Sequence, residues 1–74
     1  MDTLQQRFAG HVRARRESLG LSTSLCAEAA GVSEIAWRKW EQGVRWPSAD
    51  SLQAIAAALD TTPGQLLDGP RPAK

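Results

Sequence analysis

The sequence is poor in the residues that build disulfides, metal sites and membrane spans. It has one cysteine, Cys26, and one histidine, His11. A lone cysteine cannot form an internal disulfide, and this pair is too small a ligand set for zinc, so we expect no metal and no cofactor. No stretch approaches the roughly 20 apolar residues that span a bilayer. The first residues also lack the basic region and apolar run of a signal peptide, so we expect a cytoplasmic protein without membrane association.

An excess of positive charge is also missing. The formal net charge is +1, from nine basic and eight acidic residues, whereas phosphate binding usually needs a marked basic excess. In the middle of the chain Arg38 and Lys39 are outnumbered by acidic side chains, namely Glu28, Glu34 and Glu41. The first segment is richer in arginine: Arg7, Arg13, Arg15 and Arg16. Any basic face must therefore be assembled by folding. The sequence also offers no nucleophile with its base and no phosphate-binding loop, so we do not expect an enzyme.

Helical periodicity is what the sequence does contain. With 74 residues and 42% hydrophobic content, the chain suits one small domain. Leu4, Phe8 and Val12 recur every fourth residue and predict a helix over residues 3–18. Ser48 opens a second strong pattern, in which apolar residues recur at helical spacing up to Leu59.

The end of the chain predicts a short last helix and a tail. Thr62 and Pro63 are typical of a helix start, and Leu66 and Leu67 are placed to return to the core. Residues 69–74 have no apolar residue worth burying. We therefore expect an all-α domain over residues 1–68, without β-strand alternation, and a flexible C-terminal tail at 69–74.

Two short helical patterns in the centre predict a helix-turn-helix. Ser22 and Ser33 each precede a helix-forming run, where a hydroxyl accepts a backbone N–H that the first turn leaves unpaired. Gly31 falls in the turn between the runs, and Gly43 ends the second run. Glycine adopts the left-handed backbone of such turns without the steric cost of a side chain.

The second of these helices has two unlike faces. On a helical wheel, Trp37 and Trp40 lie on one side. The opposite side is polar except for one isoleucine: Glu34, Ile35, Arg38, Lys39 and Gln42. A solvated outer face would explain this pattern in an arbitrary amphipathic helix. The serine caps, the glycine turn and the spacing together favour a functional face.

These elements resemble the lambda repressor/Cro-type helix-turn-helix family, the XRE-like transcription regulators. The resemblance covers Arg13 to Leu67, and it lies in the order and spacing of the set. Its members are Gly20-Leu21-Ser22, Ala27, Gly31-Val32-Ser33, Glu41-Gln42-Gly43 and Pro47-Ser48. It implies a compact five-helix lambda-repressor-like domain, with the helix-turn-helix at helices 2 and 3, whose third helix lies in the DNA major groove.

The resemblance also implies which side chains read bases. The family's base-reading positions fall on Glu34, Ile35, Arg38 and Lys39, the face that the wheel leaves exposed. Arg38 or Lys39 can donate to guanine, and Ile35 can pack on a thymine methyl group. Glu34 can accept from cytosine N4, although phosphates repel its charge. Lys39 and Ile35 are the favoured readers.

Phosphate contacts are expected from two places. One is the start of the second helix with Thr23, and the other is the loop Gly43, Val44 and Arg45. Many family members carry glutamine at the position of Thr23. The shorter side chain loses a long-reach contact to the DNA backbone.

Two further expectations follow from the resemblance. An arginine late in the first helix pairs with the glutamate that ends the third, which here means Arg16 and Glu41; the alternative is a loose surface ion pair. The region around residues 61–66 would lie beside the twofold axis of a dimer, with contacts from Pro63, Gln65 and Leu66. The alternative there is that these residues only close the core.

The expected function is a sequence-specific DNA-binding transcription regulator: a small repressor that binds a palindromic double-stranded DNA operator as a homodimer. The alternative is a protein-interaction module, such as an antitoxin that binds a toxin partner. The near-neutral charge and two apolar residues, Leu25 and Trp46, keep this alternative open. For Trp46, covering the core edge is preferred over packing on DNA sugar or on a second subunit. His11 is expected to be a solvated helix residue.

Overall fold

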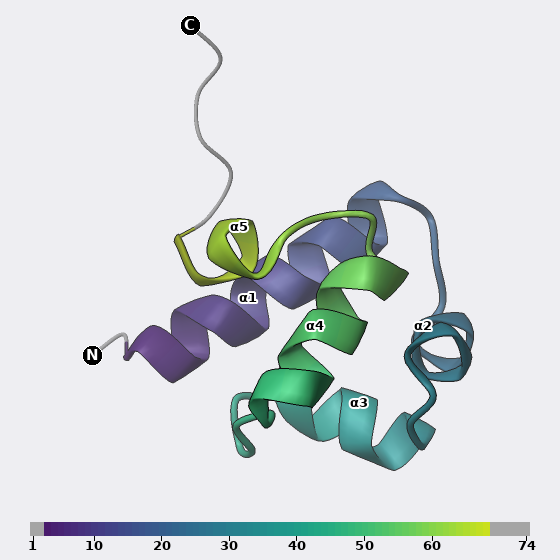
Figure 1. Cartoon of the computed structure of the whole chain (residues 1–74), viewed down its shortest axis with the longest axis horizontal. Helices are drawn as coiled ribbons and strands as arrows, with labels where there is room; N and C mark the ends of the chain where they lie inside the picture. The colour runs from purple at the N-terminus through teal and green to yellow at the C-terminus, as the bar shows by residue number, and fades with distance from the viewer. Residues whose placement is uncertain (1–2, 69–74) are drawn as a thin grey trace, which may run out of the picture.

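Five helices joined by short turns make up residues 3–68, the part of the chain that the computed structural model describes (Figure 1). The helices are α1 (Leu4–Ser18), α2 (Thr23–Ala30), α3 (Glu34–Glu41), α4 (Ala49–Ala58) and α5 (Pro63–Asp68). The expected all-α, five-helix class is confirmed, and residues 3–68 contain no strand. The tail expected at 69–74 lies outside the described residues.

A hydroxyl side chain caps the start of every helix. In each case its oxygen accepts the backbone N–H three residues further on, which satisfies a donor that the first turn leaves unpaired. The caps are Thr3, Ser22, Ser33, Ser48 and Thr62. Helix starts predicted from Ser22, Ser33, Ser48 and Thr62 are therefore confirmed.

Two glycines close the helices of the helix-turn-helix. Gly31 follows α2 with φ of +73°, and Gly43 follows α3 with φ of +74°. Both values lie in the left-handed region, where a side chain is strained and glycine is not. The predicted roles of these glycines are confirmed. The turn at Gly31 lets α3 run across the lower edge of the molecule in Figure 1, with α2 at one end of it.

The core lies where the five helices meet. Helix α2 packs against α3 and α4, and α1 packs against α3 and α5. Ten buried residues from all five helices and their ends form it: Phe8, Val12, Cys26, Ala27, Trp37, Trp40, Ile55, Ala56, Leu59 and Leu66. Burial raises the pKa of the Cys26 thiol, which therefore stays protonated at neutral pH.

The apolar stripe of α1 is only partly buried. Phe8 and Val12 lie in the core, but Leu4 is 49% exposed. The first turn of α1 projects beyond the helices that cover the rest of it (Figure 1). The edge of the core at Phe8 is covered by Trp46, whose ring meets that of Phe8 edge-on with centroids 5.1 Å apart. The preferred role of Trp46 is confirmed.

No helix within residues 3–68 is both long and apolar enough to cross a membrane.

Candidate nucleic-acid interface

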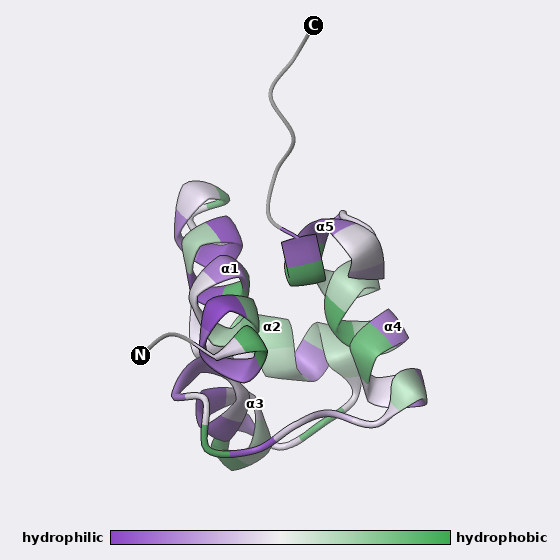
Figure 2. Ribbon diagram, turned by 90° about the vertical axis from the view of Figure 1, so that its left-hand side faces the viewer, coloured by the Kyte–Doolittle hydropathy of each residue, from purple (hydrophilic) through white to green (hydrophobic). Residues whose placement is uncertain are grey.

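The orientation of α3 is set by its two tryptophans. Trp37 and Trp40 are buried, and their rings meet edge-on with centroids 6.1 Å apart. Because this side of α3 faces the core, the opposite side faces outward. Ile35 is 69% exposed, and Arg38 and Lys39 are exposed beside it. The division into an apolar and a polar face, predicted from the wheel, is confirmed. Figure 2 shows α3 at the lower edge of the molecule, below α1.

A largely buried ion pair holds α3 against α1. Arg16 donates to both carboxylate oxygens of Glu41, from Nε at 2.7 Å and from Nη2 at 3.1 Å. The two side chains are only 15% and 8% exposed, so this is no loose surface pair. The hydrogen bond to Glu41 raises the pKa of Arg16 above its already high ordinary value, so the guanidinium stays charged.

The ion pair has two further partners that the sequence reasoning missed. Trp37 Nε1 donates to Glu41 Oε2, and Arg16 Nη1 donates to the carbonyl of Leu21 at 3.0 Å. The first was detectable, because Trp37 lies one helical turn before Glu41. The cluster ties α1, the turn before α2 and α3 together, and thereby fixes the angle at which the outer face of α3 is presented.

A second polar cluster joins α2 to the outer face of α3. Glu34 Oε2 accepts hydrogen bonds from Thr23 Oγ1 at 2.7 Å and from Arg38 Nη2 at 2.9 Å. The hydrogen bond from Thr23, helped by Arg38, lowers the pKa of Glu34 below its ordinary value. The hydroxyl hydrogen of Thr23 is therefore used inside the protein. A phosphate contact at this residue is left to its backbone N–H, at the start of α2.

Backbone N–H groups of the loop after α3 donate to carbonyls in the last turn of that helix. Gly43 N–H donates to the carbonyl of Trp40, and Val44 N–H to that of Lys39, both at 3.2 Å. Gln5 on α1 donates to the carbonyl of Gly43 at 2.7 Å, a contact across 38 residues of sequence with no signal in the pattern. Both N–H groups therefore have partners inside the protein, and the phosphate contacts expected from Gly43 and Val44 stay a prediction. Arg45 is exposed.

Helix α5 is held to α1 by a hydrogen bond and by the core. His11 Nδ1 lies 2.7 Å from the carbonyl oxygen of Leu66, and the His11 side chain is half-buried. The expectation that His11 is solvated is corrected. Leu66 is 2% exposed, so the predicted return of its side chain to the core is confirmed, and its part in a subunit contact stays a prediction. Pro63 is half-buried and Gln65 exposed.

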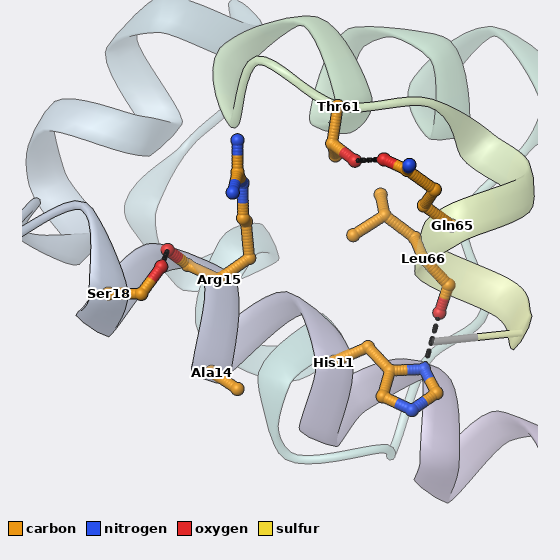
Figure 3. Close-up of a pocket in the computed structure, with 7 residues that line it drawn as sticks. All are labelled: His11, Ala14, Arg15, Ser18, Thr61, Gln65 and Leu66. Atoms are coloured by element: carbon orange, nitrogen blue, oxygen red, sulfur yellow. Dashed lines mark hydrogen bonds between the residues drawn. The ribbon is translucent and has the colours of Figure 1, made fainter. Parts of the chain in front are cut away.

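A shallow hollow of about 390 Å³ lies between α1 and α5 (Figure 3). It is lined by His11, Ala14, Arg15, Ser18, Thr61, Gln65 and Leu66. Beside it, the Arg15 guanidinium donates to two carbonyls at the end of α4, those of Leu59 at 2.9 Å and Asp60 at 3.0 Å. Arg15 therefore stabilises the turn between α4 and α5, a role that the sequence reasoning did not assign.

Comparison with known proteins gives the family. The sequence profile of the "Helix-turn-helix domain" family matches residues 7–68. The "Repressor protein C2" of Salmonella phage P22 is 33% identical over 64 residues, which are 86% of this chain and 30% of that protein. This chain therefore spans less than a third of the length of that curated relative.

Solved structures of similar proteins support the same family. The solution structure of the DNA-binding domain of the P22 c2 repressor has a TM-score of 0.84 and 32% identity, covering 93% of this chain and 88% of that one. The crystal structure of the P22 c2 repressor with a synthetic operator has a TM-score of 0.81 and 32% identity, covering 88% and 98%. The chain thus belongs to the helix-turn-helix domain family, and its lambda repressor/Cro-type resemblance is confirmed.

Proposed function

We propose that this chain binds double-stranded DNA as a transcription repressor, with α3 in the major groove. The observation that carries the proposal is the outer face of α3. Two buried tryptophans and the Arg16–Glu41 pair fix this helix, so that a polar face with one isoleucine is held outward on a rigid element. A similar domain, that of the P22 c2 repressor, forms a complex with a synthetic operator. A cytoplasmic location goes with this proposal, since a repressor shares the compartment of its DNA.

The proposed base contacts come from the face of α3 that carries Glu34, Ile35, Arg38 and Lys39, directly or, for Glu34, through its hydrogen bond with Arg38. Arg38 and Lys39 can donate to guanine O6 and N7, and Ile35 offers an exposed apolar side chain to a thymine methyl group. These contacts would supply the sequence preference, because hydrogen bonds to base edges carry the sequence information and phosphate contacts do not.

The proposed phosphate contacts flank the groove. The N–H groups in the first turn of α2, at Thr23 and Ser24, have no intrahelical partners by the geometry of a helix start. They suit an anion, which the positive end of the helix dipole also attracts. On the other side Arg45 is exposed next to the closed turn at Gly43 and supplies a charge.

The proposed assembly is a homodimer on a palindromic operator. One recognition helix reads only a few base pairs, and a net charge of +1 adds little nonspecific affinity. Two subunits related by a twofold axis double the contacts. Pro63 and Gln65 on α5 supply the surface for the subunit contact, and the buried Leu66 supports it from the core.

Selection of bound sequences from random duplex DNA, repeated at two salt concentrations, tests this function. We expect one palindromic site to be enriched, with affinity that falls as salt rises, because phosphate contacts release counterions. Failure to enrich any site would contradict the proposal. It would favour the second candidate, a protein-interaction module such as an antitoxin, for which the 55% exposure of Leu25 offers an apolar contact.

A further inference from the structure

We propose that Glu34 is a positioning residue: it does not read a base, but holds the guanidinium of Arg38, and Arg38 is the side chain that reads guanine. This inference rests on the proposed DNA-binding function and refines it.

The geometry gives Glu34 a fixed place. Its Oε2 atom accepts from Thr23 on α2 at 2.7 Å and from Arg38 on the next turn of α3 at 2.9 Å. Because Thr23 belongs to another helix, the carboxylate is anchored from outside α3 and cannot follow every movement of Arg38. The Arg38 side chain is 62% exposed, and an exposed arginine without a partner samples many rotamers. The anchored carboxylate restricts this choice before DNA arrives.

The hydrogen bond leaves Arg38 able to bind a base. A guanidinium has five N–H groups, and Glu34 takes one, on Nη2. The remaining donors include those of Nη1 and the second hydrogen of Nη2, the pair that can bind guanine O6 and N7 together. Lys39 can also donate to both acceptors, but from a single ammonium group on a flexible stem, without the planar fork of donors that matches them. The structure therefore favours Arg38 over Lys39 as the guanine reader.

The same contacts make Glu34 a poor reader. A carboxylate that faces DNA is repelled by the phosphates unless a cation lies next to it. Here the cation is Arg38, and the hydrogen bonds from Thr23 and Arg38 lower the pKa of Glu34, so it stays charged and stays paired. Its negative charge is paired with the guanidinium of Arg38.

Specificity measurements on single and double variants test the inference. Operator duplexes changed at each base pair are bound to the wild-type chain, Arg38→Ala, Glu34→Ala and the double variant. We expect Arg38→Ala to lose about tenfold or more of the discrimination at one guanine. Glu34→Ala should lose part of the discrimination at that same guanine. In the Arg38→Ala background, removing Glu34 should cost no further discrimination.

Two matched variants distinguish the positioning of Arg38 from a general effect of negative charge on DNA affinity. Glu28→Ala removes the same charge from an exposed site on α2, and it should raise affinity for all DNA alike without changing base preference. Glu34→Gln keeps an accepting oxygen and should retain more of the guanine preference than Glu34→Ala. In the free chain, the NMR order parameter of the Arg38 Nε–H should fall in both Glu34→Ala and Thr23→Val, a change that a merely stabilising residue would not cause.

Three outcomes would overturn the inference. Loss of discrimination at a different base pair in Glu34→Ala would show that Glu34 reads a base directly. Unchanged discrimination in Glu34→Ala, when Arg38→Ala loses it, would show that Glu34 does not act through Arg38. In both cases the wild-type chain still selects a site and the proposed function stands. A wild-type chain that selects no sequence would overturn the function and this inference together.

Discussion

Arg16 and Glu41 form a two-point ion pair, at 2.7 and 3.1 Å, that joins the last turn of α1 to the last residue of α3. Trp37 donates to the same carboxylate from the core side. Because three donors converge on one buried carboxylate, α3 cannot roll about its axis without breaking several hydrogen bonds. The hydrogen bonds that stabilise the fold therefore also fix the direction in which the outer face of α3 points.

Replacing Glu41 by alanine should destabilise the fold by about 1 to 3 kcal/mol, because Arg16 would be left charged and Trp37 unpaired in a largely buried place. Urea denaturation measures this. The control is Glu17→Ala, which breaks an exposed i,i+4 pair with Arg13 on α1 and should change the free energy of unfolding by less than about 0.5 kcal/mol. Equal effects of the two substitutions would show that burial of the Arg16–Glu41 pair adds nothing to the free energy of unfolding.

Two glycines should respond to alanine with opposite signs. Gly31 has φ of +73° and an empty space where a Cβ would lie, so Gly31→Ala carries backbone strain alone, about 1 to 2 kcal/mol. Gly10 lies inside α1 with open space and no positive φ, so Gly10→Ala should stabilise by about 0.5 to 1 kcal/mol. Thermal midpoints that shift in the same direction would contradict the backbone assignment at one of them.

Glu34 should titrate below the usual glutamate pKa of about 4.3, because its charged form accepts hydrogen bonds from Thr23 and Arg38. A folded-state pKa that is lowered means that the contribution to stability is complete above the unfolded-state value. It is lost as the pH falls through the folded-state pKa. Carboxyl ¹³C NMR measures the midpoint, and Thr23→Val should raise it. A midpoint that does not move in Thr23→Val would remove Thr23 as its main cause.

Residues that contact bases and residues that contact phosphates should differ in how their loss affects affinity for specific and random DNA. Ile35→Ala and Lys39→Ala should cost about 1 to 3 kcal/mol on the selected operator and little on random DNA, because base contacts are specific. Arg45→Ala should weaken both alike and flatten the salt dependence, as loss of a phosphate contact does. Titrations at several salt concentrations measure both. Equal losses of Lys39→Ala on both DNAs would reassign Lys39 to a phosphate.

The spacing of half-sites should matter to a twofold dimer. The two recognition helices would read half-sites about 34 Å apart, one turn of the duplex. Inserting five base pairs, about half a turn, should place the second half-site on the opposite face and abolish the gain from the second subunit. An insertion of ten base pairs serves as the phase control. Affinity that survives the five-base-pair insertion intact would contradict a rigid dimer.

Local features of this chain were predictable from the residue pattern. Serine and threonine caps, glycines at positive φ and the two faces of α3 each depend on neighbours within one or two turns of helix. Trp37 and Trp40 are buried because they share a face at helical spacing. The pairing of Arg16 with Glu41 was also expected, but through resemblance to a family, since the two residues lie 25 positions apart.

Other features depend on distances between helices, which periodicity does not encode. Gln5 meets the carbonyl of Gly43, and His11 that of Leu66, across 38 and 55 residues. The pattern placed Glu34 and Arg38 on one face, but only the packing of α2 on α3 brought Thr23 to the same carboxylate oxygen. Amino-acid type decides which elements form and which side is apolar. Which polar atoms are left free at the surface is decided when the helices meet, because each internal hydrogen bond removes a donor from the surface.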